Sequence, residues 1–332
     1  MSNNPFVSII LPVYNGDAYI KESITSILNQ SYGHFELIIM NDASTDTSFD
    51  IIKSIQDKRI RLINNDENMG LIKTLNKGLS LSNGKYIARM DQDDIALNKR
   101  IEEQVNFMEK NPKIGISGTY IDRFSNNKRI RIAKVPTKPE IIKCLLLFKN
   151  CLAHPSVIIR KDVLEKNQIS YNILHTAAED YGLWQNASFY TVVANLPKVL
   201  LKYRENPTGM TSIADSDKNK NRRKTIYKII YKQGLTHFGF EPSDKELELH
   251  YLCASDDDID IATLSDISKY LVKLKLQNKT HPIYNPFYFN SLLNRIWFKV
   301  CMKCRGSKIM NVKIYFKSEL SKRGNPLLFR SF

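Results

Sequence analysis

The sequence lacks the features that would place its 332 residues in a membrane or outside the cell. No apolar run approaches the roughly 18 residues that a bilayer span requires. The opening residues, MSNNPFVSIILPVYNG, have no basic segment ahead of their apolar run, so we expect no signal peptide. The five cysteines form no disulfide framework, and the C-x-x-C pair of Cys301 and Cys304 has no second pair or nearby histidine to complete a zinc site. These absences predict a cytoplasmic protein.

Two phosphate-binding motifs are also missing. The chain has neither the G-x-x-x-x-G-K-[ST] loop of ATPases nor a G-x-G-x-x-G turn after a predicted strand. Both motifs hold phosphate oxygens with backbone N–H groups, so their absence argues against an ATPase and against a dinucleotide-dependent enzyme. A metal ion is the remaining means of neutralising a bound diphosphate.

What is present is an ordinary globular composition with an uneven charge. Hydrophobic residues make up 42% and charged residues 25% of the chain, and the net charge is +15. From residue 266 onward, fourteen lysines and arginines stand against Asp266 and Glu319, so a net charge of +12 falls in the last fifth of the chain. Charge gathered in this way predicts an anionic partner for the tail, either nucleic acid or a lipid surface.

The first two hundred residues alternate strand-like and helix-like stretches, which predicts an α/β sheet. The expected strands are 6–13, 35–40, 60–63, 86–90, 114–118 and 156–159, and the expected helices are 17–29, 46–55, 71–81 and 99–110. Residues 215–221 are polar and end this pattern, and beyond them apolar positions recur at helical spacing. We therefore expect an α/β domain over residues 1–215 and a basic, mainly helical region over 216–332.

Three carboxylates follow the strand expected at 86–90, in the segment KYIARMDQDD. Open α/β sheets bind ligands at strand ends, and Asp91, Asp93 and Asp94 would repel one another there without a partner cation. Carboxylates at this spacing supply the hard oxygen ligands that Mg²⁺ or Mn²⁺ prefers, with phosphate oxygens completing the shell. For the triplet alone, a solvated acidic turn is the alternative.

Polar loops follow two more of the expected strands and emerge at the same edge of the sheet. Pro12 and Tyr14 end the first strand, and Asp42 follows the second. A carboxylate such as Asp42 accepts hydrogen bonds from a base, for example from N3–H of uracil, although it would serve equally as the N-cap of the next helix. Three polar loops at one edge predict a nucleotide-binding crevice.

These segments resemble the motif series of a known family. VSIILPVYNG, IIMNDASTD, NMGLIKTLNKGL, YIARMDQDD and the later AED are similar, in order and spacing, to the motifs of family 2 glycosyltransferases over residues 5–205. The resemblance implies the GT-A nucleotide-sugar-binding fold and a metal-dependent, inverting transfer of a sugar from a nucleoside diphosphate donor, with a UDP-sugar as the expected donor. It further implies a donor site in which Asp91 contacts the ribose or diphosphate, Asp93 and Asp91 ligate Mn²⁺ or Mg²⁺, and the nucleoside pocket is lined by Pro12, Tyr14 and Asp42. Asp94 is the trailing acid of this motif.

The resemblance also implies an acceptor side. Asp180 would be the base that takes the proton from the acceptor hydroxyl, with Glu179 positioning the acceptor or the metal ion. The alternative is that both residues merely begin a helix, whose positive end favours carboxylates. His154 begins a segment, expected to open a strand, that resembles one lining the acceptor; a structural histidine is the alternative. Arg89 and Arg204 would pair with the carboxylates or with the diphosphate.

The sequence departs from the family pattern in two places. Where the family often has a histidine shortly after the Tyr203-Arg204 pair, this chain has Glu205 and Asn206, so we expect no histidine ligand from that loop. The Q-x-x-R-W element of processive members is absent after Asp180. We therefore predict a nonprocessive hexosyltransferase that acts on a glycan or a lipid-linked acceptor in cell-surface polysaccharide or lipopolysaccharide synthesis.

Two other functions share some of these sequence features. A nucleotidyltransferase shares the need for acidic metal ligands beside a nucleotide, but its glycine-rich start is missing here. A nucleic-acid-binding protein fits the charge, but no recognition motif supports it and the basic residues avoid the carboxylate-rich half, so we expect no nucleic-acid partner. The sequence predicts neither the donor sugar nor the oligomeric state.

The basic tail has its own expectation. Arg295, Lys299 and Lys303 follow one another at i, i+4 on an expected helix, and apolar residues occupy its other face, namely Leu293, Ile296, Trp297 and Val300. A basic stripe of this kind predicts contact with anionic headgroups, which would make the protein peripheral on the inner face of the cytoplasmic membrane. The alternative is a helix that packs its apolar face on the protein and leaves the basic residues in water.

Overall fold

The computed structural model describes residues 4–125, 128–206, 220–304, 308–322 and 324–329. The chain forms two compact units, one made of Met1–Pro139 with Cys151–Asn219 and the other of Glu140–Asn150 with Lys220–Phe332. The boundary predicted between residues 215 and 216 lies outside the described residues and stays a prediction.

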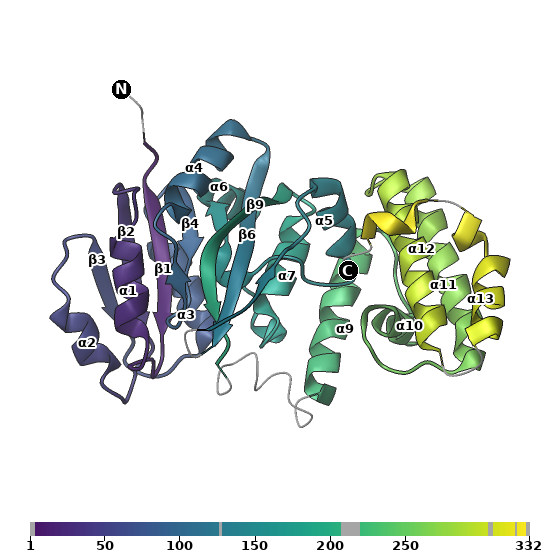
Figure 1. Ribbon diagram of the computed structural model, residues 1–332, viewed down its shortest axis with the longest axis horizontal. Helices are drawn as coiled ribbons and strands as arrows, with labels where there is room; N and C mark the ends of the chain where they lie inside the picture. Colours follow the sequence, from purple (N-terminus) through teal and green to yellow (C-terminus); the bar gives the residue numbers. More distant parts are fainter. Residues whose placement is uncertain (1–3, 126–127, 207–219, 305–307, 323, 330–332) are drawn as a thin grey trace. The chain divides into compact units, whose positions relative to one another are not determined.

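The first unit is built on one mixed sheet with the strand order β3-β2-β1-β4-β8-β6-β9-β5, and β7 pairs with β6 (Figure 1). Four strands are parallel to one another: β1 (Val7–Val13), β2 (Phe35–Asn41), β3 (Ile60–Asn64) and β4 (Tyr86–Arg89). The remaining strands are β5 (Ile95–Ala96), β6 (Ile114–Ser125), β7 (Lys128–Ala133), β8 (Ile158–Arg160) and β9 (Val192–Arg204). The helices of this unit are α1 (Ile20–Leu28), α2 (Ser48–Ser54), α3 (Leu71–Leu81), α4 (Arg100–Lys110), α6 (Lys161–Lys166) and α7 (Glu179–Ala187), with 3₁₀ turns at His154–Ser156 and Ile173–His175.

Strand β1 is buried on both faces, as its continuous apolar run predicts. Alternate side chains of a strand point to opposite faces of the sheet. The odd-numbered residues from Val7 to Val13 belong to one apolar cluster with residues of α1 and α4. Ile10 points the other way, toward α3, where a Cβ added to Gly78 would lie 2.8 Å from its Cγ2 atom. The glycine therefore lets α3 approach the sheet closely.

The predicted α/β class is confirmed, and the strands and helices expected before residue 114 are all present within a few residues of the expected positions. Three expectations need correction. β6 continues to Ser125 instead of ending at residue 118. His154–Ser156 form a 3₁₀ turn, and the strand begins only at Ile158. β9 was not expected, because exposed Pro197 and Lys198 interrupt its apolar pattern.

The second unit is helical. Its elements are α5 (Pro139–Leu145), α9 (Lys220–His237), α10 (Asp244–Ala254), α11 (Ile261–Thr280), α12 (Pro286–Lys303) and α13 (Lys308–Lys317), with 3₁₀ turns at Glu319–Lys322 and Pro326–Phe329. The apolar positions predicted to share a face in α11 and in α12 are buried, including Ile267, Leu271, Ile296 and Trp297. In the described part of the chain, none of the helices combines the length and the apolarity that crossing a membrane requires.

The basic stripe predicted on α12 is only partly present. Lys303 Nζ donates hydrogen bonds of 2.7 Å to the carbonyl oxygens of Leu252 and Ser255. An ammonium group there satisfies carbonyls at the C-terminal end of α10. Lys303 therefore does not extend the stripe of Arg295 and Lys299 toward a membrane surface.

A buried histidine ties residues 140–150 to the helices of the second unit. His250 is fully buried in α10, and its ring stacks on Phe148 with 4.4 Å between the ring centroids. Its Nε2 lies 2.9 Å from the carbonyl oxygen of Leu147, which accepts only, so Nε2–H donates there. The other nitrogen, Nδ1, then accepts from the hydroxyl of Tyr270 at 2.7 Å. Burial lowers the pKa of His250 to about 3, so the ring is neutral at physiological pH.

We predict that His250→Leu lowers the free energy of unfolding by about 2–4 kcal/mol, because the Leu147 carbonyl and the Tyr270 hydroxyl lose their partner inside the protein. Chemical denaturation followed by circular dichroism measures the change. His237→Leu, at an exposed position of α9, is the control and is expected to change stability by less than about 0.5 kcal/mol.

The wild type and His250→Leu can also be compared as a function of pH. His250 has a folded pKa of about 3 and an unfolded pKa of about 6.5, so only the unfolded state takes up its proton between these values. The stability that His250 contributes is therefore complete above about pH 6.5 and is lost as the pH falls, by about 1.4 kcal/mol per pH unit. The stability difference between the wild type and His250→Leu should shrink from pH 7 to pH 5, and a constant difference would contradict a neutral His250.

Candidate active site

Three parallel strands bring the predicted site loops to one edge of the sheet. β1 lies between β2 and β4, and all three run in the same direction, so their carboxyl ends coincide. Pro12 is buried near the end of β1, Asp42 follows β2, and Asp91 to Asp94 follow β4. The prediction that these loops emerge at a common edge is confirmed.

The acidic loop after β4 gathers three carboxylates. Oxygen atoms of Asp91, Asp93 and Asp94 all lie within 4.8 Å of one another. Burial, together with the charge of Asp91, raises the pKa of Asp93 to about 6. Burial is also the main reason why the pKa of Asp94, which is 1% exposed, lies well above its usual value. The cluster therefore holds fewer negative charges at neutral pH than its three carboxyl groups would carry in water.

This cluster fits a divalent cation. Its donors are hard carboxylate oxygens, the kind that Mg²⁺ and Mn²⁺ prefer. Oδ2 of Asp94 is buried and has no hydrogen-bond partner among the described residues, which leaves one oxygen lone pair unsatisfied inside the protein. A nearby cation would satisfy that oxygen and would oppose the repulsion that raises the two pKa values.

Arg204, at the end of β9, holds the acidic loop in place through two hydrogen bonds. Its backbone N–H donates to Oδ1 of Asp94 at 2.9 Å, and its Nε donates to the carbonyl oxygen of Asp93 at 2.8 Å. Its guanidinium also pairs with Glu22 at 2.5 Å and lies 4.2 Å and 4.5 Å from the ring centroids of Tyr19 and Phe124. These contacts occupy the side chain, which is 9% exposed. The predicted contact of Arg204 with the donor stays a prediction.

Gln92, inside the acidic loop, joins it to the loop after β1. Its Oε1 accepts from the backbone N–H of Tyr14 at 2.9 Å, and its Nε2 donates to the Tyr14 carbonyl at 3.2 Å. The Tyr14 side chain itself is 45% exposed and is available for a ligand. A Cβ on Gly16 would lie 2.6 Å from the Gln92 side chain, so the glycine makes room for this link.

The loops after β1 and β2 are also joined directly. The Asn15 N–H donates to the Ser44 hydroxyl at 3.1 Å, and Oδ1 of Asn15 accepts from the Thr45 N–H at 2.8 Å. Asn15 and Ala43 have positive φ angles of 48° and 55°. Such a φ angle is unfavourable for alanine and persists only where surrounding contacts hold it, which is common at ligand sites.

Asp42 does not cap the helix after it, which begins without a side-chain cap. Its Oδ1 accepts from Asn65 Nδ2 at 2.8 Å and from the Met69 N–H at 2.9 Å, and its Oδ2 accepts from the Gly70 N–H at 2.9 Å. The carboxylate therefore fixes the loop that leads into α3. Carboxylate oxygens have further lone pairs, so these three bonds leave the predicted hydrogen bond to a base feasible, and it stays a prediction.

Arg89 stands between the acidic loop and the first turn of α7. It is 5% exposed and forms an ion pair with Asp91. Its Nε and Nη1 atoms have no hydrogen-bond partner among the described residues, and its charge also acts on Glu179. Burial, and then the charge of Asp180, raise the pKa of Glu179 to about 7. Asp180 is half-buried and accepts from the Tyr181 N–H at 2.6 Å.

His154 lies behind Glu179. Its Nδ1 is 3.9 Å from Oε1 of Glu179, and its Nε2 forms a 2.8 Å hydrogen bond with the hydroxyl of Tyr171. Burial lowers the pKa of His154 well below its usual value, so the ring is neutral at pH 7. Asn76 of α3 holds the backbone of Tyr171 at both its N–H (3.0 Å) and its carbonyl (2.9 Å). The structure thus brings His154 and both carboxylates of the AED segment to one place.

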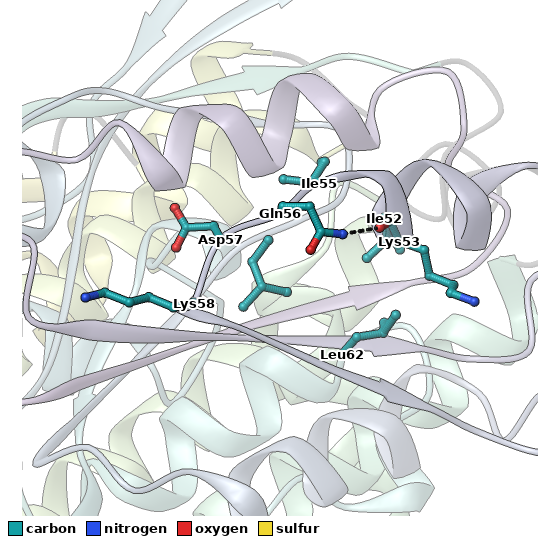
Figure 2. A pocket seen from close by; sticks show the side chains of 8 residues that line it. Ile52, Lys53, Ile55, Gln56, Asp57, Lys58 and Leu62 are labelled. Carbon is teal, nitrogen blue, oxygen red and sulfur yellow. Dashed lines mark hydrogen bonds between the residues drawn. The ribbon is translucent and has the colours of Figure 1, made fainter.

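A pocket of about 500 Å³ lies elsewhere, between the end of α2 and β3. Figure 2 shows Lys53, Gln56, Asp57 and Lys58 around it. These residues precede β3, so the pocket opens near the amino ends of the parallel strands, opposite the acidic loop. None of the predicted site residues lines it.

The sequence analysis did not identify four residues at this edge. Gln92 occupies a position between two aspartates where many residue types would fit. Tyr171 and Glu22 reach the site only through the fold and carry no local pattern. Asn76 lies within NMGLIKTLNKGL, so the motif contained a signal for it, but its distant partner Tyr171 was not readable from the sequence.

Comparisons with known proteins agree with this architecture. The family model described as "Glycosyl transferase family 2" matches residues 8–167. An uncharacterized glycosyltransferase of Haemophilus influenzae is 36% identical over 249 residues, which cover 72% of this chain and 76% of that protein. WfgD of Escherichia coli, a UDP-Glc:alpha-D-GlcNAc-diphosphoundecaprenol beta-1,3-glucosyltransferase, is 34% identical over 179 residues, which cover 54% of this chain and 68% of that protein.

A solved structure supports the fold. The crystal structure of S. aureus TarS, residues 1–349, in complex with UDP-GlcNAc matches this chain with a TM-score of 0.59 at 14% identity. The match covers 93% of this chain and 89% of that one. At this identity the likeness establishes the fold alone, which is the GT-A arrangement followed by C-terminal helices.

The sequence predicts a UDP-sugar donor together with Mn²⁺ or Mg²⁺. On that prediction Gln92→Ala should weaken the binding of UDP with Mn²⁺ by about tenfold, because two hydrogen bonds that hold the Tyr14 loop are lost. Isothermal titration measures the affinity, and thermal unfolding should be unchanged because the side chain is not in the core. Gln56→Ala removes a comparable hydrogen bond, to the Lys53 carbonyl, from the pocket in Figure 2 and is the matched control. Equal affinities for all three proteins would exclude a role for Gln92 in holding the loop for the nucleotide.

Proposed function

This chain belongs to the family 2 glycosyltransferases, and we propose that it transfers a sugar, with inversion, from a nucleoside diphosphate to a hydroxyl group of a glycan or lipid-linked acceptor. One observation carries the proposal. The clustered carboxylates of Asp91, Asp93 and Asp94 lie near a second acidic pair, Glu179 and Asp180, and the buried guanidinium of Arg89 interacts with both Asp91 and Glu179. Such a site has one acidic group for the donor and another for the acceptor.

The donor half is proposed to comprise the loops after β1, β2 and β4. Tyr14 offers an exposed ring for a base, and Asp42 lies in the adjoining loop as a hydrogen-bond acceptor. The Nε and Nη1 atoms of Arg89, which have no hydrogen-bond partner among the described residues, are suited to diphosphate oxygens, because a guanidinium matches phosphate geometry. UDP is the proposed nucleotide, which is supported by the UDP-sugar in the name of the WfgD relative.

Asp93 and Asp91 are the residues that would hold a divalent cation, Mn²⁺ or Mg²⁺, with Asp94 behind them. When bound, this ion supplies positive charge that neutralises the diphosphate. The chain's own part is to hold the carboxylates together, and Arg204 does so through the backbone of the loop.

The acceptor half is proposed to be the first turn of α7. Asp180 takes the proton from the acceptor hydroxyl as its oxygen attacks the anomeric carbon on the face opposite the leaving diphosphate. Glu179 and His154 lie beside it and position the acceptor. Asp180 lies in the first turn of α7, at the positive end of the helix dipole, and its charge contributes to the raised pKa of Glu179.

The acceptor is proposed to be a growing surface polysaccharide or lipopolysaccharide on a lipid carrier. The WfgD relative is named for a diphosphoundecaprenol acceptor, and this supports a lipid-linked one here. Such an acceptor would place the enzyme at the inner face of the cytoplasmic membrane.

The donor proposal is tested with Asp93→Ala. We expect loss of glycosyl transfer and of the stabilisation that UDP with Mn²⁺ gives in thermal-shift measurements, because the ligand set for the ion is broken. The fold should remain, since a partly exposed loop carboxylate contributes little to stability. Asp66→Ala, an exposed acid at the same edge, is the control. Activity in Asp93→Ala, or insensitivity of the wild type to EDTA, would overturn the metal assignment, and a panel of nucleotide sugars would identify the donor.

The base proposal is tested with Asp180→Asn. The amide keeps the shape of the side chain but does not accept a proton, so turnover should fall by roughly 10²–10⁴-fold. UDP affinity should stay nearly unchanged, because the base acts on the acceptor. Glu165→Gln, on the exposed surface of α6, is the control for removing one carboxylate. If UDP binding fell in step with turnover, Asp180 would be a donor ligand or a structural residue instead.

A further inference from the structure

We propose that the outer face of α13 (Lys308–Lys317) is a docking surface for an anionic lipid bilayer. The sequence pointed to a stripe on α12, but that helix buries its apolar face and Lys303 binds carbonyl groups of α10. α13, at the yellow end of the chain in Figure 1, differs from α12 because its exposed side is itself both apolar and basic.

The inner face of α13 is fixed by contacts with α12. The Tyr315 hydroxyl donates to Oδ1 of Asn294 at 2.7 Å, and the Tyr315 carbonyl accepts from Nε1 of Trp297 at 3.3 Å. Asn311, one turn earlier, donates through Nδ2 to the Cys304 carbonyl at 3.0 Å. Asn311 is 1% and Tyr315 8% exposed. The helix therefore has a defined orientation on the second unit.

Among the described side chains of α13, five on the opposite face are exposed. Three are apolar, with exposed fractions of 47% for Met310, 40% for Val312 and 65% for Phe316. Two are basic, Lys313 and Lys317, and both are exposed. At about 100° per residue these five positions fall within an arc of roughly 160°, so they form one continuous surface.

The chemistry of this face fits a membrane surface better than other partners. Exposed aromatic and aliphatic side chains enter the boundary between headgroups and acyl chains, while adjacent lysines pair with anionic headgroups. α13 contains no acidic residue, and it belongs to the last fifth of the chain, which carries a net charge of +12. A nucleic acid would account for the lysines but not for three apolar side chains set among them.

This inference rests on the proposed function, because the role proposed for membrane binding is to bring the enzyme to a lipid-linked acceptor. Its test needs no sugar donor, so the two proposals fail separately. Lys313, Phe316 and Lys317 belong to the second unit and take no part in the proposed active site.

The experiment is sedimentation of the full chain with vesicles of phosphatidylcholine, with or without phosphatidylglycerol. We expect binding to the anionic vesicles that weakens as salt rises, and little binding to neutral ones. Lys313→Gln with Lys317→Gln should weaken binding by about tenfold or more, since each charge near the surface contributes about fivefold. Phe316→Ser should also weaken it. The matched control, Lys232→Gln with Lys279→Gln, removes the same charge from exposed positions of α9 and α11 and should change binding by less than about twofold.

Thermal unfolding should be the same for all variants, because the substituted side chains are exposed. An equal loss in the control pair would mean that net charge alone attracts the protein, and it would overturn the assignment to α13. Failure of the wild type to bind anionic vesicles at low salt would overturn it as well. Binding to single-stranded or duplex oligonucleotides that is lost in the Lys313/Lys317 pair but unaffected by Phe316→Ser, without vesicle binding, would reassign the face to nucleic acid.

Discussion

The arrangement of the site depends on holding several carboxylates close together in a partly dry place. Asp94 is almost completely buried, and oxygen atoms of Asp91 and Asp93 lie within 4.8 Å of its own. Such a cluster is costly, because burial and like charge both disfavour ionisation. The chain offsets the cost with arginines. Arg89 pairs with Asp91, and Arg204 gives the loop two hydrogen bonds.

Several contacts in the first unit hold this carboxylate cluster in place. β9 places Arg204 beside the acidic loop, although Arg204 follows Asp94 by 110 residues in the chain. Arg204 is in turn held by an ion pair with Glu22 of α1 and by contacts with the rings of Tyr19 and Phe124. Arg100 of α4 supports the end of β4, because its Nη2 donates a hydrogen bond to the Arg89 carbonyl at 2.6 Å. Burial lowers the pKa of Arg100 to about 10. The side chain still adds positive potential near the carboxylates.

The sequence predicted the parts of this arrangement that are local. A continuous apolar run identified β1, the helical spacing within 71–81 identified α3, and three carboxylates after a strand identified the acidic loop. It could not predict that Asp42 holds the loop before α3, because Asn65 and Gly70 have no pattern that names a partner. The second unit was also only partly predictable. Residues 140–150 belong to the second unit, although the segments before and after them belong to the first. Their assignment depends on contacts between residues distant in sequence, such as that between Leu147 and His250.

The charges of the site are consistent with a ligand that brings its own cation. Arg89 faces Asp91 on one side and Glu179 on the other, yet two of its nitrogens are unpaired among the described residues. The raised pKa values of Asp93, at about 6, and Glu179, at about 7, reflect burial and neighbouring negative charges, which both disfavour further negative charge at the site. A divalent cation held by the acidic loop would favour the ionised form of Asp93, because a ligating carboxylate must be ionised. The diphosphate could then meet Arg89 without adding to the repulsion. Metal and donor would therefore bind more tightly together than either would alone, since each removes an electrostatic cost of binding the other.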